Sequence, residues 1–269
     1  MMNRQGFLLL GVLTLAMLAV GCARQSVNRF QGYIEGEYVY IASPLGGALT
    51  DLAVARGQSV TNGQLLFILE RGSEAAALAA AKENLAQAQA DLRLAEAELA
   101  RREQLRADRG VISAEELDQA RARRDAAAAQ VKSLQAALDK AQWSFDQKEQ
   151  FAPTNAFVQD TLYRPGEWVA AGRPVVVLLP PANLKVRFFV PETELARIQT
   201  GETVRVTLDG APHPYSATVN YLSTQAEFTP PVLYNRENRA KLVYMIEAGF
   251  APADAAALRP GQPVEVTLP

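Results

Sequence analysis

One long segment constrains the fold of this chain more than any other feature of its sequence. From Ser73 to Ala152 the chain contains no proline, and glycine occurs only at Gly110. Proline breaks a helix interior and glycine weakens it, so a segment of this length without either residue favours helix. The sequence therefore predicts two helices of about equal length with one break between them, near Gly110.

Both predicted helices carry a heptad pattern of small and large apolar residues. In the first helix the two registers of the pattern are Leu78, Leu85, Leu92 and Leu99, and Ala81, Ala88 and Ala95. In the second helix they are Leu117, Val131, Leu138 and Phe145, and Ala120, Ala127, Leu134 and Ala141. Leucine facing alanine allows two helices to approach closely, which predicts an antiparallel coiled-coil hairpin with arms of about 50 Å.

Local signals specify the reversal between the helices. Gly110 stands where a residue in the left-handed region would end the first helix. Ser113 and Glu116 have the spacing of a capping box for the second helix, and Ile112 and Leu117 that of a hydrophobic staple. A sharp turn is therefore expected between Gly110 and Ile112.

The segments on either side of the predicted hairpin are copies of one another. At an offset of 109 residues, five residues recur: Pro44, Asp51, Gly57, Val60 and Gly63 match Pro153, Asp160, Gly166, Val169 and Gly172. An apolar run follows in each copy, and the glycines stand where tight turns between short strands need a positive φ. Each copy is expected to form half of a small β-sandwich.

The composition excludes several classes of function. Lys plus Arg number 27 against 29 Asp plus Glu, so no net positive field favours nucleic acid or an anionic membrane surface. Cys22 and His213 are the only cysteine and histidine, which excludes a Cys/His zinc cluster and an intrachain disulfide. His213 lies between two prolines in an expected surface loop, and no pair of carboxylates or glycine-rich phosphate loop is recognisable. We therefore expect no catalytic residues, no metal and no cofactor.

The first residues are typical of a targeting signal. Arg4 precedes an apolar run from Phe7 to Val20, and Cys22 follows directly. This resembles a bacterial lipoprotein signal, in which the peptidase cuts before a cysteine that carries the lipid. The alternative is a signal anchor that stays in the membrane, with Cys22 an ordinary apolar residue.

The C-terminal third alternates between apolar and polar residues in short stretches, at 184–190, 202–208 and 261–268. Turn sequences separate these stretches, which favours a small antiparallel barrel. We expect Tyr33 to Ile41 to add an edge strand to it.

Together, from roughly residue 32 to 268, these features resemble the HlyD-type membrane fusion proteins, the periplasmic adaptors. The two half-motifs resemble those of a lipoyl/biotinyl domain, with Gly57, Val60, Gly63 and Leu66 in the family's spacing. The fold class implied is α+β: an elongated modular adaptor with an α-helical hairpin inserted into a split lipoyl-like β-sandwich, plus a small antiparallel β-barrel. The expected domains are a lipoprotein signal peptide (1–21), a lipidated linker (22–32), a β-barrel (33–41 and 183–269), a lipoyl-like domain (42–72 and 151–182) and a hairpin (73–150).

The resemblance also implies a docking site at the hairpin tip. Adaptors of this family dock on a TolC-like outer-membrane channel through an arginine, a leucine four residues later and a serine that opens the returning helix. The matching positions, with Leu105 one residue earlier than the pattern has it, are Arg102, Leu105, Arg106, Gly110 and Ser113. Ser113 is explained equally well as a helix cap, and the two roles are compatible. Three more arginines, at 121, 123 and 124, either touch the channel or flank the seam.

The implied function is a non-enzymatic periplasmic adaptor in efflux, anchored through a lipid on Cys22. Its partners would be an inner-membrane transporter, the channel and further copies of itself, a hexamer by analogy. Because the chain ends with the barrel, the membrane-proximal domain of adaptors for proton-driven RND pumps is not expected, which favours an ABC transporter. Ala23 after the cysteine leaves open which membrane holds the lipid, with the inner membrane favoured by function. A lipid-anchored structural spacer remains an alternative, as does a lipoyl or biotinyl carrier, although the junction Glu70-Arg71-Gly72-Ser73 has no lysine.

Overall fold

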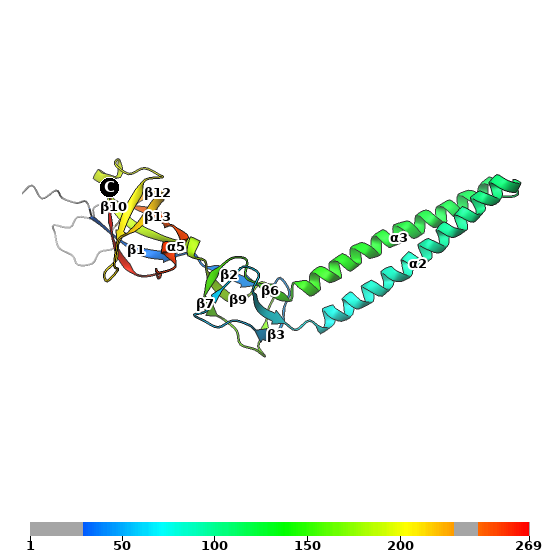
Figure 1. Cartoon of the computed structure of the whole chain (residues 1–269), viewed down its shortest axis with the longest axis horizontal. Coiled ribbons are helices and arrows are strands. Elements are labelled where there is room, and N and C mark those ends of the chain that lie inside the picture. The colour runs from blue at the N-terminus through cyan, green and yellow to red at the C-terminus, as the bar shows by residue number, and fades with distance from the viewer. Residues whose placement is uncertain (1–28, 229–241, 269) are drawn as a thin grey trace, which may run out of the picture. The chain divides into compact units, whose positions relative to one another are not determined.

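The computed structural model describes residues 29–228 and 242–268, so the signal-like segment with Cys22 lies outside the described residues. The chain divides into two compact units. One comprises Glu37–Asn183, and the other combines the described residues before Glu37 with those after Asn183. Figure 1 shows helices and antiparallel strands in the α+β arrangement predicted from the sequence.

The first unit contains a sandwich of two four-stranded sheets, with strand orders β2-β9-β7-β4 and β6-β5-β3-β8. Each sheet takes two strands from before the hairpin and two from after it. The strands are β2 Val39–Ala42, β3 Gly47–Leu52, β4 Ser59–Val60, β5 Leu65–Leu69, β6 Glu149–Phe151, β7 Ala156–Thr161, β8 Trp168–Val169 and β9 Pro174–Leu179. Neither copy of the repeat can therefore complete a sheet alone.

The repeated glycines join the two copies in a symmetric way. Gly57 has φ of 89° and its N–H donates to the carbonyl oxygen of Val158 at 2.9 Å. Gly166 has φ of 92° and its N–H donates to the carbonyl oxygen of Leu49 at 2.7 Å. Leu49 and Val158 are themselves one repeat apart, so each copy closes a turn of its own against a strand of the other. The expectation that the copies form one sandwich is confirmed.

The sandwich encloses an apolar core to which both copies contribute. Its most deeply buried members are large aliphatic and aromatic residues, each below 2% exposed, at Leu49, Leu66, Phe67, Leu69, Val158, Val169, Val175 and Leu178. Burying a side chain of this kind contributes about 1.5 to 3 kcal/mol. The core is thus the main source of stability in this unit.

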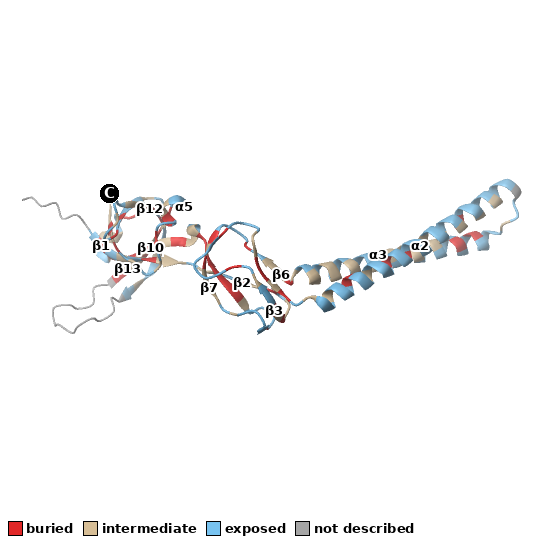
Figure 2. Cartoon of the chain, turned by 60° about the horizontal axis from the view of Figure 1, so that its bottom comes forward, coloured by how far each residue is buried: buried red, intermediate tan, exposed pale blue. Residues whose placement is uncertain are grey.

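The hairpin consists of α2 (Gly72–Arg109) and α3 (Ala114–Asp146), which run side by side (Figure 1). At the α-helical rise the arms are about 57 and about 50 Å long. All the predicted heptad positions are buried or half-buried, and Figure 2 shows buried positions at intervals along both helices. The predicted seam is confirmed. Between Leu117 and Val131 the seam also contains Arg124, which is half-buried.

The second unit is a closed barrel with the strand order β1-β10-β13-β12-β11-β14. The strands are β1 Arg29–Gly36, β10 Leu184–Pro191, β11 Thr203–Thr207, β12 Tyr215–Phe228, β13 Leu242–Phe250 and β14 Pro263–Thr267. One-turn helices α4 (Glu192–Leu195) and α5 (Pro252–Ala255) follow β10 and β13, and the 3-10 turn η1 (Pro181–Asn183) precedes β10. Alternate residues of β10 point inward and are fully buried, as a barrel wall requires.

The barrel contains a second internal repeat that the sequence reasoning missed. Ile198, Gly201 and Val204 recur 60 residues later as Leu258, Gly261 and Val264. Both glycines have positive φ, 92° and 85°, and each N–H donates at 2.8 Å to a carbonyl on a neighbouring strand. A comparison of the C-terminal third with itself at this offset would have found the repeat.

The prediction for Tyr33 to Ile41 is confirmed for residues 33–36, which lie in the barrel, and wrong for the rest of the segment and for its edge position. The segment forms two strands in different sheets: β1 starts earlier, at Arg29, and β2 pairs with β9 of the sandwich. β1 is also not an edge strand, since it pairs with both β10 and β14. The chain leaves one sheet for the other at Glu37 and Tyr38. The buried positions change phase there, from Phe30 and Ile34 to Ile41, and the sequence reasoning overlooked this change.

Candidate functional site: the hairpin tip and the hairpin base

The tip of the hairpin is a tight reversal that begins at Gly110. This glycine has φ of 62°, and its N–H donates to the carbonyl oxygen of Arg106 at 3.0 Å, which ends α2. No atom lies within 4 Å of the position that a Cβ would occupy, so the positive φ and not a lack of space favours glycine here. The predicted left-handed helix end is confirmed.

The second helix begins with the predicted capping box. The Oγ of Ser113 accepts a hydrogen bond from the Glu116 N–H at 3.1 Å, and Oε2 of Glu116 accepts one from the Ser113 N–H at 2.9 Å. These bonds hold the pKa of the Glu116 carboxyl below its usual value, because the Ser113 backbone N–H and hydroxyl both donate to the ionised form. Ile112 is half-buried and Leu117 is buried, as a hydrophobic staple requires. The turn is therefore fixed from both of its ends.

The residues assigned to channel docking gather in the last turns before the tip. Arg102 and Leu105 are half-buried at seam positions, whereas Arg106 and Ser113 are exposed. The Arg102 side chain reaches the carbonyl oxygen of Glu116 on the returning helix at 3.5 Å. Val111, which the sequence reasoning did not select, is 66% exposed at the apex. The tip thus offers one apolar side chain surrounded by polar ones, and docking by these residues stays a prediction.

Two of the three neighbouring arginines, Arg121 and Arg124, form ion pairs within the hairpin, and contact of any of the three with the channel stays a prediction. Arg121 pairs with Glu103 across the hairpin at 3.4 Å and with Asp118 along its own helix at 3.5 Å, while its side chain stays half exposed. Arg124 lies on the seam and pairs with Asp125 at 3.0 Å. Exposed ion pairs of this kind contribute little to stability, so their main effect is on the register and charge of the rod.

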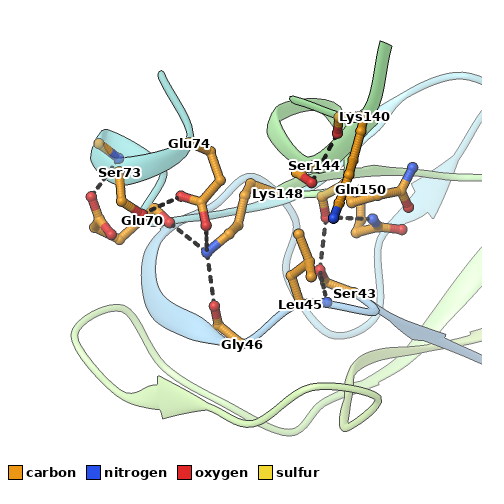
Figure 3. A network of polar contacts seen from close by, with 12 residues as sticks. Ser43, Leu45, Gly46, Glu70, Ser73, Glu74, Lys140, Ser144, Lys148 and Gln150 are labelled. Carbon is orange, nitrogen blue, oxygen red and sulfur yellow. Dashed lines mark hydrogen bonds and ion pairs between the residues drawn. The ribbon is translucent and has the colours of Figure 1, made fainter. Parts of the chain in front are cut away.

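At the other end, the hairpin base is held by a buried lysine. Lys148 follows α3 and is only 3% exposed. Its ammonium donates to the carbonyl oxygens of Gly46 at 2.8 Å and Glu70 at 3.1 Å, and pairs with Oε1 of Glu74 at 3.0 Å (Figure 3). Burial acts to raise the pKa of the Glu74 carboxyl, but hydrogen bonds from Lys148 and Ser73 outweigh it and the net shift is downward.

Two further contacts close the hairpin base. Arg71 forms an ion pair with Glu149, which joins the start of α2 to the strand that follows α3. The guanidinium of Arg71 also lies 4.8 Å from the ring centre of Phe145, within the range of a cation–π contact. On the sandwich side, the buried hydroxyl of Ser43 donates to the carbonyl oxygen of Gln147 at 2.7 Å (Figure 3).

Sequence reasoning missed this base because it treated the charges of the hairpin as a solvated face. A signal was present: Glu74 precedes Leu78 and Lys148 follows Phe145 at the spacing that continues the apolar seam. Opposite charges at facing positions of a seam indicate a buried ion pair.

The barrel carries a second, partly buried charge cluster. Glu247 accepts hydrogen bonds from Lys185 and from Arg187, each at 2.7 Å, and Arg187 also pairs with Glu35 at 2.7 Å. Burial acts to raise the pKa of the Glu247 carboxyl, but the hydrogen bonds from Lys185 and Arg187 outweigh it and the net shift is downward. A carboxylate held ionised by two cations is suited to a structural role and unsuited to proton transfer at neutral pH.

The described residues offer little for catalysis or cofactor binding. Among them, no group of three or more His, Cys, Asp or Glu side chains is placed to hold a metal ion. His213 is exposed and lies against the ring of Tyr215, with 5.3 Å between ring centres. A lysine that carries a prosthetic group must be accessible, but Lys148, the lysine at the junction, is buried with its donors occupied. Within residues 29–228 and 242–268, no helix combines the length and the apolar character needed to cross a bilayer.

Comparisons with known proteins found matches to the hairpin alone and to most of the chain. The family model described as "RND MFP, alpha-helical hairpin domain" matches residues 77–148. A UPF0194 membrane protein of Citrobacter koseri is 31% identical over 289 residues, covering 88% of this chain and 87% of that protein. The solved membrane fusion protein Spr0693 of Streptococcus pneumoniae R6 is 21% identical with a TM-score of 0.65, over 90% of this chain and 98% of that one. MacA of Actinobacillus actinomycetemcomitans is 18% identical with a TM-score of 0.61, over 90% of this chain and 78% of that one.

Proposed function

The chain belongs to the membrane fusion protein family, and from this premise we propose that it is a periplasmic adaptor linking an inner-membrane exporter to a TolC-like outer-membrane channel. One observation carries the proposal. A two-helix hairpin with a packed apolar seam and a capped tip extends from a sandwich that is formed by both flanking segments. Such a rod has no core for a substrate, and its length serves to hold its tip at a distance from the sandwich.

The tip is the surface that we propose meets the channel. Val111 supplies an exposed apolar contact, and Arg102, Arg106 and Ser113 supply donors around it. The capping box and the left-handed Gly110 fix the backbone of the turn, so little conformational entropy is lost when it docks. Leu105 is half-buried on the seam, which favours a supporting role for it beneath the contact.

Crosslinking from the tip of the full-length chain tests this proposal. A photoreactive amino acid at position 111 should capture an outer-membrane channel protein, because Val111 is exposed and takes no part in the capping box. The same amino acid at position 94 is the matched control, since Leu94 is 61% exposed but lies midway along α2. Capture of no outer-membrane protein from position 111, or equal capture from both positions, would contradict the docking role.

For the transporter we propose the ABC class, with export of small molecules or other substrates. The hairpin model that matches is named for the RND class, so experiment must separate the two. An ABC partner predicts that the purified adaptor stimulates ATP hydrolysis by the reconstituted transporter. Transport that is abolished by collapsing the proton gradient while ATP is kept constant would point to an RND partner instead.

We propose further that the chain is held at the membrane, with the inner membrane favoured, through a lipid on Cys22 and that it assembles as a ring, a hexamer by analogy. Cys22 lies outside the described residues, and support for the lipid comes from the signal-like sequence before it. Metabolic labelling with palmitate tests it: the wild-type chain should take up label and Cys22→Ser should not. Native mass spectrometry of the detergent-solubilised chain gives the number of subunits.

The spacer alternative predicts a different genetic result. If the protein acts with an exporter, deleting the partner transporter should reproduce the phenotype of deleting this protein. A phenotype that depends on this protein but persists unchanged without any transporter would favour a structural spacer.

A further inference from the structure

The ammonium of Lys148 is surrounded by acceptors that belong to three different segments. Gly46 lies in the loop before β3, Glu70 follows β5, and Glu74 is in the first turn of α2. Lys148 itself lies between α3 and β6. One side chain therefore ties both ends of the hairpin to the sandwich, as Figure 3 shows.

Every hydrogen-bond donor of the Lys148 ammonium has an acceptor. A lysine ammonium has three N–H donors and no acceptor, and three acceptors lie within 3.1 Å of it. The chain also leaves room for it: a Cβ added to Gly47 would lie 3.1 Å from the ammonium nitrogen. A buried charge is tolerated only when it is paired and fully hydrogen-bonded, and here both conditions are met.

Comparison of the two repeat copies shows that the lysine and its acceptors occur only where the hairpin joins the sandwich. One repeat earlier, the position equivalent to Lys148 is Val39, and one repeat later, those equivalent to Gly46 and Glu70 are Asn155 and Leu179. The second copy thus has no counterpart of the buried ion pair, whereas the strands and glycine turns recur in both copies. The sandwich fold does not require the lysine.

We propose that Lys148 is a positioning residue that fixes the direction in which the hairpin leaves the sandwich, and so the place where the tip presents its docking surface. Small rotations at the base are amplified by the length of the arm. A swing of about 10° displaces the end of an arm of about 57 Å by about 10 Å. The functional meaning of this inference rests on the adaptor role proposed above, but its test is structural and does not.

The test measures distances in the full-length chain. Spin-labelled non-natural amino acids are placed at position 56, an exposed site in the sandwich, and at position 107, an exposed site near the tip. A second pair, at the exposed positions 86 and 107, lies within α2 and reports on the straightness of the rod. Cys22 is left in place.

Lys148→Met should broaden the 56–107 distance distribution by several ångströms, up to about 10 Å, and leave the 86–107 distribution unchanged. Lys132→Met, which removes an exposed lysine of α3, should leave both unchanged. An unchanged 56–107 distribution in Lys148→Met would overturn the proposal. Equal broadening of both pairs would also overturn it, because the rod itself would then have loosened.

A second variant covers the case in which Lys148→Met does not fold. Glu74→Gln preserves the shape of the side chain and removes only its charge, at a position that is partly exposed. A broader 56–107 distribution in Glu74→Gln supports the proposal, and an unchanged one contradicts it. Because neither readout involves transport, a failed adaptor assignment and a failed positioning role remain distinguishable.

Discussion

The two roles considered for Ser113 can be separated by replacing it in two ways. Ser113→Ala removes the Oγ that accepts the Glu116 N–H and leaves that donor without its side-chain partner. Loss of an N-cap of this kind costs about 1 kcal/mol, whereas asparagine caps a helix about as well as serine. We therefore expect Ser113→Asn to stay within a few tenths of a kcal/mol of the wild-type protein.

Hydrogen exchange of a peptide covering 113–120 measures the cap directly. At tenfold per about 1.4 kcal/mol, loss of about 1 kcal/mol should speed exchange in the first turn of α3 by about fivefold in Ser113→Ala and hardly at all in Ser113→Asn. Exchange in 78–92, far from the tip, provides the internal control.

Crosslinking from position 111 in the same variants then decides the functional question. If Ser113 acts only as a cap, capture of the channel should follow the exchange rates and survive in Ser113→Asn. If its hydroxyl contacts the channel, Ser113→Asn should lose capture while its exchange stays normal. Unchanged exchange in Ser113→Ala would refute the reasoning from the capping box altogether.

The remaining predictions concern stability. Leu66→Ala, at a fully buried position, should lower the free energy of unfolding by about 2 to 5 kcal/mol. Leu94→Ala, at an exposed position, should lower it by less than about 0.5 kcal/mol. Trp fluorescence in urea measures both values, because Trp143 and Trp168 lie in the unit that contains the sandwich and the hairpin. Gly57→Ala and Gly166→Ala should each cost about 1 to 2 kcal/mol in the same assay, and markedly unequal losses would contradict the symmetric roles of the two turns. The lowered pKa of Glu247 means that its ionised form stabilises the barrel above the ordinary value of 4.5 and that this contribution is lost as pH falls through the depressed pKa of the folded state. Glu247→Gln should therefore be less stable than the wild-type protein at pH 7, and the difference should shrink as pH falls below 4.5 and through the depressed pKa. Hydrogen exchange of β10 and β13 measures this, and a constant difference at all pH values would count against the ion pairs.

The features that the sequence predicted well are those written in local periodicity. Helix length, the seam and the capped tip depend on residues within a few turns of one another. The residue types of Gly110 and Ser113 alone predicted the left-handed helix end and the N-cap. The repeat added a long-range constraint, because it predicted that Gly57 and Gly166 adopt the same positive φ in equivalent turns.

The features that it missed depend on which strand pairs with which. β1 and β2 are separated by only two residues, and their different partners, β10 and β9, show that they belong to different sheets. The spacing of the seam continues through Glu74 and Lys148, but the burial of Lys148 also depends on carbonyl groups that come from about 80 and 100 residues earlier in the chain. The positions of those carbonyl groups carry no periodic signal.

The interleaving of the two copies has a consequence for how the chain acquires its structure. One sheet cannot be completed before β8 of the second copy has been made and the other not before β9, and strands so far apart in the sequence pair slowly. The helices between them form local contacts, so we expect them to pair early and to bring Ile68 next to Glu149, where β5 meets β6. On this reasoning, the hairpin shortens the search by which the two distant halves of one core find each other during folding.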